Sequence, residues 1–290
     1  MRIVQDNMCN YSEILESVKE YIETDYREEL SLDQIADKFS LSKYHFHKLF
    51  KSYFGVTPKT LIERLKLERA AHLLKYTDAS IIDIAFEFGY QNHETFTRAF
   101  KRIFGTNPLQ YRRSKKEYEK RTQANLSEIK IPKTLGISNP TIKYLNEIKV
   151  AYIRHIGDYR KIDVTWRRLV ALGQKSNFLS KESNLMGIYY DDPEITQTEK
   201  LRYDACVEIE NFLNVSADIQ NRVIEKGKFM VFRYTGELSK LDEVYAFIYH
   251  DYILKQNIDL EDRPNIEMYI TSPAFLRQHH YITDICIPIK

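Results

Sequence analysis

Apolar side chains recur at the spacing of an α-helix in two stretches near the start of the chain. In the first stretch the apolar stripe consists of Phe46, Leu49, Phe50 and Phe54. In the second it consists of Phe96, Ala99, Phe100, Ile103 and Phe104. A stripe of this kind faces a core while the other sides of the helix stay exposed. The pattern therefore predicts two amphipathic helices.

The two stretches belong to an internal repeat. Residues 31–61 and 79–111 follow one plan, with a short amphipathic helix, a tight turn and a second helix. The equivalent positions include Ile35 and Ile84, Ala36 and Ala85, Phe46 and Phe96, Phe50 and Phe100, Gly55 and Gly105, and Pro58 and Pro108. This plan is typical of a helix-turn-helix, and two copies in one chain predict a monomer that reads two neighbouring stretches of DNA groove.

The polar face of each second helix carries side chains that can contact base edges or phosphates. In the first copy the candidates for DNA contact are Ser42, Lys43, Tyr44, His47, Lys48 and Lys51. In the second copy they are Asn92, His93, Glu94, Thr97, Arg98 and Lys101. Ser42 and Asn92 are also suited to cap these helices. An ordinary exposed helix displays lysine and arginine too, but a matched second copy favours DNA binding.

The motifs in this region resemble those of AraC/XylS-type transcription regulators. They are Ile-Ala in the first helix of each copy, Phe-Lys-x-x-Phe-Gly at the end of the second, and the proline that follows, within residues 10–113. The resemblance implies two helix-turn-helix units joined by a long central helix, here residues 58–76. It also implies recognition helices that enter successive major grooves, with base contacts from Tyr44, His47, Lys48, Glu94, Thr97 and Arg98.

Beyond residue 133 the apolar pattern changes from helical spacing to alternation, which predicts strands. The expected strands are residues 149–153, 185–190, 204–209, 229–234, 266–270 and 284–289, and the expected helices are residues 163–178 and 240–255. The polar stretch before them lacks apolar periodicity. We therefore expect a DNA-binding domain at residues 1–115, a linker at 116–141 and a second domain at 142–290.

The second half of the chain is also duplicated. The segment AYIRHIGDY from Ala151 resembles MVFRYTGEL from Met230, and DACVEI from Asp204 resembles DICIPI from Asp284. The repeat predicts two strand-helix-strand-strand units related by a pseudo-twofold axis, which together form an α+β domain after the all-α domain. A ligand cleft is expected between the two halves.

Glu267 is the centre of the candidate ligand site. Strand alternation places Glu267 and Tyr269 on one face, and Gly187 and Tyr189 hold the equivalent positions in the other half. Tyr152 and Trp166 are further candidates for the lining. A carboxylate among aromatic rings attracts a lipophilic cation. The pattern equally allows Glu267 and Tyr269 to face water, so the residues alone leave both interpretations open.

Four separated motifs in this half resemble the GyrI-like effector-binding domain over residues 142–290. They are VAYIRHIGDY, GIYYDDP, RYDACVEI and PNIEMY. The resemblance implies a bulky, lipophilic, often cationic ligand, and it favours the cleft. Some members hydrolyse reactive small molecules, so a hydrolase with Glu267 as its base is an alternative. A domain that makes protein contacts without a ligand is another.

Composition narrows these possibilities. The chain of 290 residues is 43% hydrophobic and 29% charged, as in globular proteins, and its net charge is only +2. Lys and Arg nevertheless outnumber Glu nine to two from Lys38 to Lys75, where phosphates would be contacted. The three cysteines have no metal-site or disulfide spacing, and no apolar run is long enough for a membrane span. We expect a cytoplasmic protein with double-stranded DNA, RNA polymerase and a small lipophilic effector as partners, and with no cofactor, metal or membrane.

Overall fold

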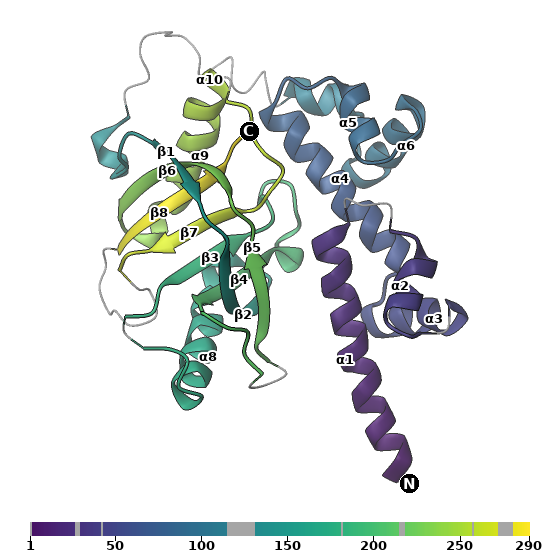
Figure 1. The fold of residues 1–290 in the computed structure, drawn as a ribbon. Coiled ribbons are helices and arrows are strands. Elements are labelled where there is room, and N and C mark those ends of the chain that lie inside the picture. The colour runs from purple at the N-terminus through teal and green to yellow at the C-terminus, as the bar shows by residue number, and fades with distance from the viewer. Residues whose placement is uncertain are drawn as a thin grey trace. The chain divides into compact units, whose positions relative to one another are not determined.

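The chain folds into two compact units, Met1–Thr122 and Gln123–Lys290. The computed structural model describes residues 2–26, 30–41, 43–114, 131–180, 182–214, 218–256, 258–271 and 281–290 (Figure 1). The first unit is helical, and the second contains one antiparallel sheet with helices. The predicted fold class is therefore confirmed. The order of the units along the chain is also the predicted one.

The N-terminal unit consists of two helix-turn-helix pairs and a connecting helix. Its helices are α1 (Arg2–Asp25), α2 (Leu32–Lys38), α3 (Lys43–Phe54), α4 (Pro58–Tyr76), α5 (Ile81–Glu87) and α6 (His93–Phe104), followed by a helical segment at residues 108–114. The pairs are α2 with α3 and α5 with α6. The long helix α4 joins them, as the sequence predicts.

The two helix-turn-helix pairs have matching turns. Ser40 and Gly89 both adopt left-handed backbone, with φ of 54° and 79°. Glycine occupies this region without steric penalty, whereas serine does so at a cost. In each pair the next amide donates to a carbonyl five residues earlier, at 2.8 Å for Leu41 and 3.0 Å for Tyr90. The repeat in sequence is thus a repeat in backbone geometry.

The apolar stripes of α3 and α6 face the core. Phe46 and Phe50 are buried with side chains of α1 and α2, and Phe96 and Phe100 are buried in the second pair. Ring contacts continue from Phe100 to Tyr111 at 5.3 Å, which holds the segment after α6 against the helix. Ile103 departs from the predicted stripe, because 39% of its surface is exposed.

The C-terminal unit is built on one eight-stranded sheet. Its strands are β1 (Thr141–Leu145), β2 (Ile148–Ile156), β3 (Leu185–Tyr189), β4 (Arg202–Glu208), β5 (Gln220–Ile224), β6 (Gly227–Gly236), β7 (Asn265–Tyr269) and β8 (Tyr281–Pro288). Its helices are α8 (Ile162–Lys175), α9 (Leu241–Ala246), a π-helical stretch Phe247–Ile253 and α10 (Leu254–Gln256). Short 3-10 turns lie at Lys133–Leu135, Tyr159–Lys161, Thr198–Lys200 and Leu238–Lys240.

The strand order reveals a twofold relationship between the halves. The order is β1-β6-β8-β7-β3-β4-β2-β5. When each strand is replaced by its counterpart in the other half, the same order is obtained from the opposite end of the sheet. The predicted strand-helix-strand-strand units are present, and each is preceded by one more strand. These additional strands are exchanged, because β1 pairs with β6 and β5 pairs with β2. Residues 136–138 of the expected linker also bond to β6.

The sheet has a different core on each face. One face carries Val150, Met186 and Cys206 together with Phe229 from the other half, so residues from strands far apart in the sheet order meet and the sheet must curl. The opposite face packs against α8 through Trp166 and Leu169. Helix α8 therefore covers only one side. Cys206 and Cys286 are buried.

Two equivalent ion pairs mark the twofold relationship. Arg154 donates to Asp204 at 2.8 and 3.0 Å, and Arg233 donates to Asp284 at 2.7 and 2.9 Å. Their surroundings differ. The Asp204 carboxylate is fully buried and also accepts from Tyr190 at 2.7 Å. The Arg233 side chain, by contrast, is 50% exposed.

This difference provides a matched test of the sheet. We expect Asp204→Ala to lower the free energy of unfolding by about 3–5 kcal/mol, because it removes the carboxylate of a buried ion pair. Asp284→Ala should cost about 1 kcal/mol or less, since its arginine is half exposed. Urea unfolding followed by the fluorescence of Trp166, the one tryptophan of the chain, measures both. Equal losses of stability in the two variants would contradict the expected difference between the buried and the half-exposed ion pair.

Two candidate functional sites

The outer face of α6 is exposed where DNA contact is expected. His93, Glu94, Arg98 and Lys101 are exposed, and Thr97 is half-buried with its hydroxyl 3.5 Å from Nδ1 of His93. Phe96 and Phe100 lie on the buried side of the same helix. Helical periodicity therefore separates the core side chains from the polar ones.

Asn92 has a structural role in the position of this helix. Its Oδ1 accepts the amide of Thr95 at 2.9 Å, which caps the N-terminus as the sequence predicts. At the other end Gly105 adopts left-handed backbone with φ of 73°. Both ends of α6 are thus defined by the sequence. The side-chain oxygen of Asn92 is engaged within the helix rather than presented outward.

The first recognition helix, α3, shows a similar division. His47, Lys48 and Lys51 are exposed, opposite the buried Phe46 and Phe50. Ser42 lies outside the described residues, and so do the side chains of Lys43 and Tyr44.

A second site lies in the C-terminal unit around Glu267. Its carboxylate is fully buried on β7, at the centre of the sheet. Tyr245, on α9, donates its hydroxyl to Oε1 at 2.8 Å, and Tyr189, on β3, donates to Oε2 at 3.3 Å. The two oxygens are therefore held from different elements.

Aromatic side chains enclose this carboxylate. The rings of Tyr189 and Tyr203 lie 4.8 Å apart, and those of Trp166 and Tyr269 lie 5.6 Å apart. The indole of Trp166 donates to the Tyr203 hydroxyl at 2.8 Å, and that hydroxyl lies 3.1 Å from the hydroxyl of Tyr269. Tyr159 adds a further ring, 5.2 Å from Tyr189. The cluster combines apolar faces with hydroxyl groups around one acid.

Burial changes the acidity of the whole cluster. It raises the pKa of Glu267 from 4.5 to about 7, although hydrogen bonds from Tyr245, Tyr269 and Tyr189 oppose the shift. Burial, followed by the nearby Glu267 charge, raises the pKa of Tyr189, Tyr245 and Tyr269 well above the usual value. These tyrosines therefore stay protonated and act as donors, while Glu267 can exist in either form near neutral pH.

The pseudo-twofold axis passes through this site. Gly187 of β3 is paired directly with Glu267 of β7, and the two positions are equivalent in the repeat. A Cβ atom at Gly187 would lie only 2.6 Å from the hydroxyl oxygens of Tyr203 and Tyr269. Glycine is required here so that these hydroxyls can approach the sheet. The two halves differ at this position, because only one of them carries a carboxylate.

Both units contain a region that matches a known domain. Residues 138–290 match the model of the GyrI-like small molecule binding domain. The chain belongs to the GyrI-like family. Residues 35–114 match a helix-turn-helix domain, in agreement with the predicted resemblance to AraC-type regulators. This order of domains is also consistent with a resemblance to the right-origin-binding protein.

Individual relatives each match part of the chain. The HTH-type transcriptional activator RhaS of Escherichia coli is 33% identical over 112 residues, which are 39% of this chain and 40% of RhaS. The chain thus spans less than half the length of this curated relative. The C-terminal domain of AraT, a response regulator from Geobacillus stearothermophilus, is 28% identical over 41% of this chain and 91% of that domain, with a TM-score of 0.34. An integron cassette protein of Vibrio cholerae is 14% identical over 53% of this chain and 97% of its own, with a TM-score of 0.40.

The GyrI-like domain brings together most of the side chains expected from the sequence. Glu267, Tyr269, Tyr189 and Trp166 share one face of the sheet. Tyr152 does not, because it lies on the opposite face with Met186 and Cys206, and we correct the expected lining accordingly. Alternation along β2 puts Ala151 and Ile153 towards the site instead.

Three tyrosines of the cluster were not predicted. Tyr245 is the repeat counterpart of Trp166, and that equivalence could have identified it. Tyr203 is the direct partner of Tyr189 on the neighbouring strand, and only the strand register reveals this pairing. Tyr159 reaches the cluster from a short 3-10 turn that carries no periodic signal.

Other kinds of site find no support in the described residues. Among them, no three His, Cys, Asp or Glu side chains are arranged to hold a metal ion. Within the same ranges no helix is both long and apolar enough to span a bilayer.

The raised pKa of Glu267 should appear in the stability of the GyrI-like domain. Since its folded pKa of about 7 exceeds the unfolded value of 4.5, the proton is bound more tightly in the folded state. The contribution of Glu267 to stability is then greatest below pH 4.5 and is lost as the pH rises to 7 and above. This loss amounts to about 3 kcal/mol. Urea unfolding at pH 5 and pH 8, with Glu267→Gln as the reference, measures this loss. Identical pH profiles for the two proteins would contradict it.

Proposed function

We propose that the protein is a sequence-specific, DNA-binding transcription regulator that acts as an activator. The supporting observation is the pair of matched helix-turn-helix units, each with an exposed, largely basic face on its second helix. A further support is the similarity of 112 residues of the chain to a transcriptional activator. As in other helix-turn-helix proteins, α3 and α6 would each enter a major groove.

Two recognition helices on one chain suit a monomer and an asymmetric site. A dimeric regulator reads two half-sites with two copies of one helix, whereas α3 and α6 differ in their exposed side chains. RNA polymerase is the proposed protein partner, as activation requires, and the cytoplasm is the proposed location. The proposed contacts are His47, Lys48 and Lys51 on α3 with His93, Glu94, Thr97, Arg98 and Lys101 on α6.

Substitution of Arg98 tests the base contacts. Arg98→Ala should weaken binding to a site selected from random duplexes by about 5- to 100-fold and relax sequence preference at one position, since a base-reading arginine contributes about 1–3 kcal/mol. Fluorescence anisotropy with labelled duplexes measures the affinity. Arg167→Ala, an exposed arginine of α8, is the control. If wild type prefers no sequence over bulk DNA, the proposal fails.

For the GyrI-like domain we propose that Glu267 binds the cationic group of a lipophilic effector. The ionised carboxylate would pair with the cation, and the rings of Tyr189, Tyr269 and Trp166 would contact its apolar parts. Because Glu267 is fully buried, an effector can reach it only if some of the surrounding rings move. The cost of burying the carboxylate would then be offset by the bound charge.

Proton release should accompany binding of such an effector. With a pKa of about 7, about one-tenth of Glu267 is ionised at pH 6 and about nine-tenths at pH 8. The affinity for tetraphenylphosphonium should therefore rise about tenfold between these pH values. Isothermal titration calorimetry in two buffers of different ionisation enthalpy measures the affinity and the released proton. Glu267→Gln should bind weakly and without this pH dependence.

An assay of turnover and the same titration separate the alternative functions of the domain. Turnover of an electrophilic compound that is abolished by Glu267→Gln would indicate a hydrolase. Absence of any binding to lipophilic cations would indicate a domain that works through protein contacts. Binding that persists at pH 8 in Glu267→Gln with wild-type affinity would move the effector away from this carboxylate.

A further inference from the structure

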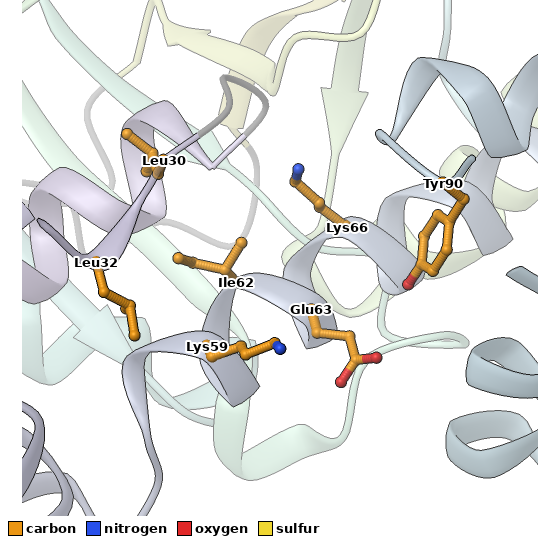
Figure 2. Close-up of a pocket in the computed structure, with 7 residues that line it drawn as sticks. All are labelled: Leu30, Leu32, Lys59, Ile62, Glu63, Lys66 and Tyr90. Carbon is orange, nitrogen blue, oxygen red and sulfur yellow. The ribbon is translucent and has the colours of Figure 1, made fainter. Parts of the chain in front are cut away.

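A groove of about 280 Å³ lies on α4 between the two helix-turn-helix pairs (Figure 2). Lys59, Ile62, Glu63 and Lys66 of α4 line it. These residues follow one another at intervals of one, three or four positions, so they form one face of the helix. Leu30 and Leu32 close the groove beside α2, and Tyr90 closes it beside α6.

An ion pair links the groove to α6. Arg98 and Arg102 are one helical turn apart and therefore share a side of that helix. The Arg102 guanidinium pairs with the Glu63 carboxylate at 2.5 Å, which joins this side of α6 to the groove. Tyr90 directly precedes the loop that leads to the Asn92 cap. A duplex on Arg98 would thus lie beside the groove.

The charges of the groove favour an anion. Glu63 is the one acidic residue of the lining, and Arg102 pairs with it, so these two residues and the two lysines of the lining comprise three basic side chains and one acidic side chain. Lys59 lies in the first turn of α4, whose N-terminus adds a partial positive charge. The ammonium of Lys66 lies against the turn before α6, 3.6 Å from where a Cβ on Gly89 would be.

The remaining lining of the groove is apolar. Leu30, Leu32 and Ile62 provide surfaces that suit deoxyribose rings better than free ions. An extended chain of sugars and phosphates offers both chemistries in alternation. Between two successive major grooves on one side of a duplex lies the minor groove, and a sugar-phosphate strand at its edge would face the protein there.

We propose that this groove holds the DNA strand that passes between the two major grooves, with Lys59 and Lys66 in contact with its phosphates. The inference rests on the proposed function and extends it. These contacts would fix the position of the duplex on the protein and supply affinity without sequence preference. They add a third contact region to the two recognition helices.

The salt dependence of binding tests the lysines in the full-length chain. In the double variant Lys59→Gln, Lys66→Gln the slope of log affinity against log salt should decrease by about 0.9 per lysine. Affinity near 0.1 M salt should fall roughly tenfold per lysine, for specific and random duplexes alike. Lys175→Gln, an exposed lysine of the GyrI-like domain, controls for charge loss. An unchanged slope, or a loss confined to the specific duplex, would overturn the proposal.

Neutral methylphosphonates locate the contact on the DNA. Replacing phosphates one at a time between the two half-sites should weaken wild-type binding at one or two positions. The double variant should be insensitive at those same positions, whereas replacements elsewhere should affect both proteins equally. If wild type shows no sensitive phosphate there, the groove does not hold the strand.

These results remain distinct from a failure of the proposed function. Loss of sequence preference in wild type would remove the regulator proposal, and the salt slope would still report whether the lysines contact phosphates. Normal sequence preference with an unchanged slope would remove only the groove. The thermal unfolding midpoint of each variant confirms that a loss of affinity does not reflect unfolding.

Discussion

The burial of one carboxylate at the centre of the eight-stranded sheet constrains the whole C-terminal unit. An acid in that position must be neutral, hydrogen-bonded or paired with a cation, because an isolated charge there is unfavourable. The ring of tyrosines satisfies Glu267 through hydroxyl donors while it excludes water. The same arrangement leaves the acid poised between two protonation states near neutral pH. The protonation of Glu267 therefore depends on the side chains that the sheet places around it.

The two duplications in the chain have diverged in different ways. In the N-terminal unit both copies retain the buried phenylalanines and the left-handed turn, and they differ on the exposed faces of α3 and α6. In the C-terminal unit the two halves differ at the centre of the sheet, where Gly187 is paired with Glu267. The first duplication thus supplies two similar helices with different exposed side chains. The second supplies one enclosed site from two related halves.

Much of this architecture could be predicted from the sequence, because repeated apolar patterns report burial. Both helix-turn-helix pairs and six of the strands follow directly from such patterns. The strands β1 and β5 could not be predicted in this way, since they are short edge strands and β1 is mostly exposed. Alternation identified Glu267 and Tyr269 correctly as neighbours on one face. It could not decide which face Tyr152 shares, because both sides of β2 are buried.

The exchange of the first strands bears on how the polypeptide folds as it is synthesised. Thr141 of β1 finds its partner in Val231, about ninety residues further along the chain. A ribosome must therefore translate the first two strands of the second half, β5 and β6, before β1 can pair. Pairings this distant in sequence close slowly, because a long loop must be ordered first. We infer that the sheet assembles late and as a single cooperative body, rather than as two halves that dock after folding.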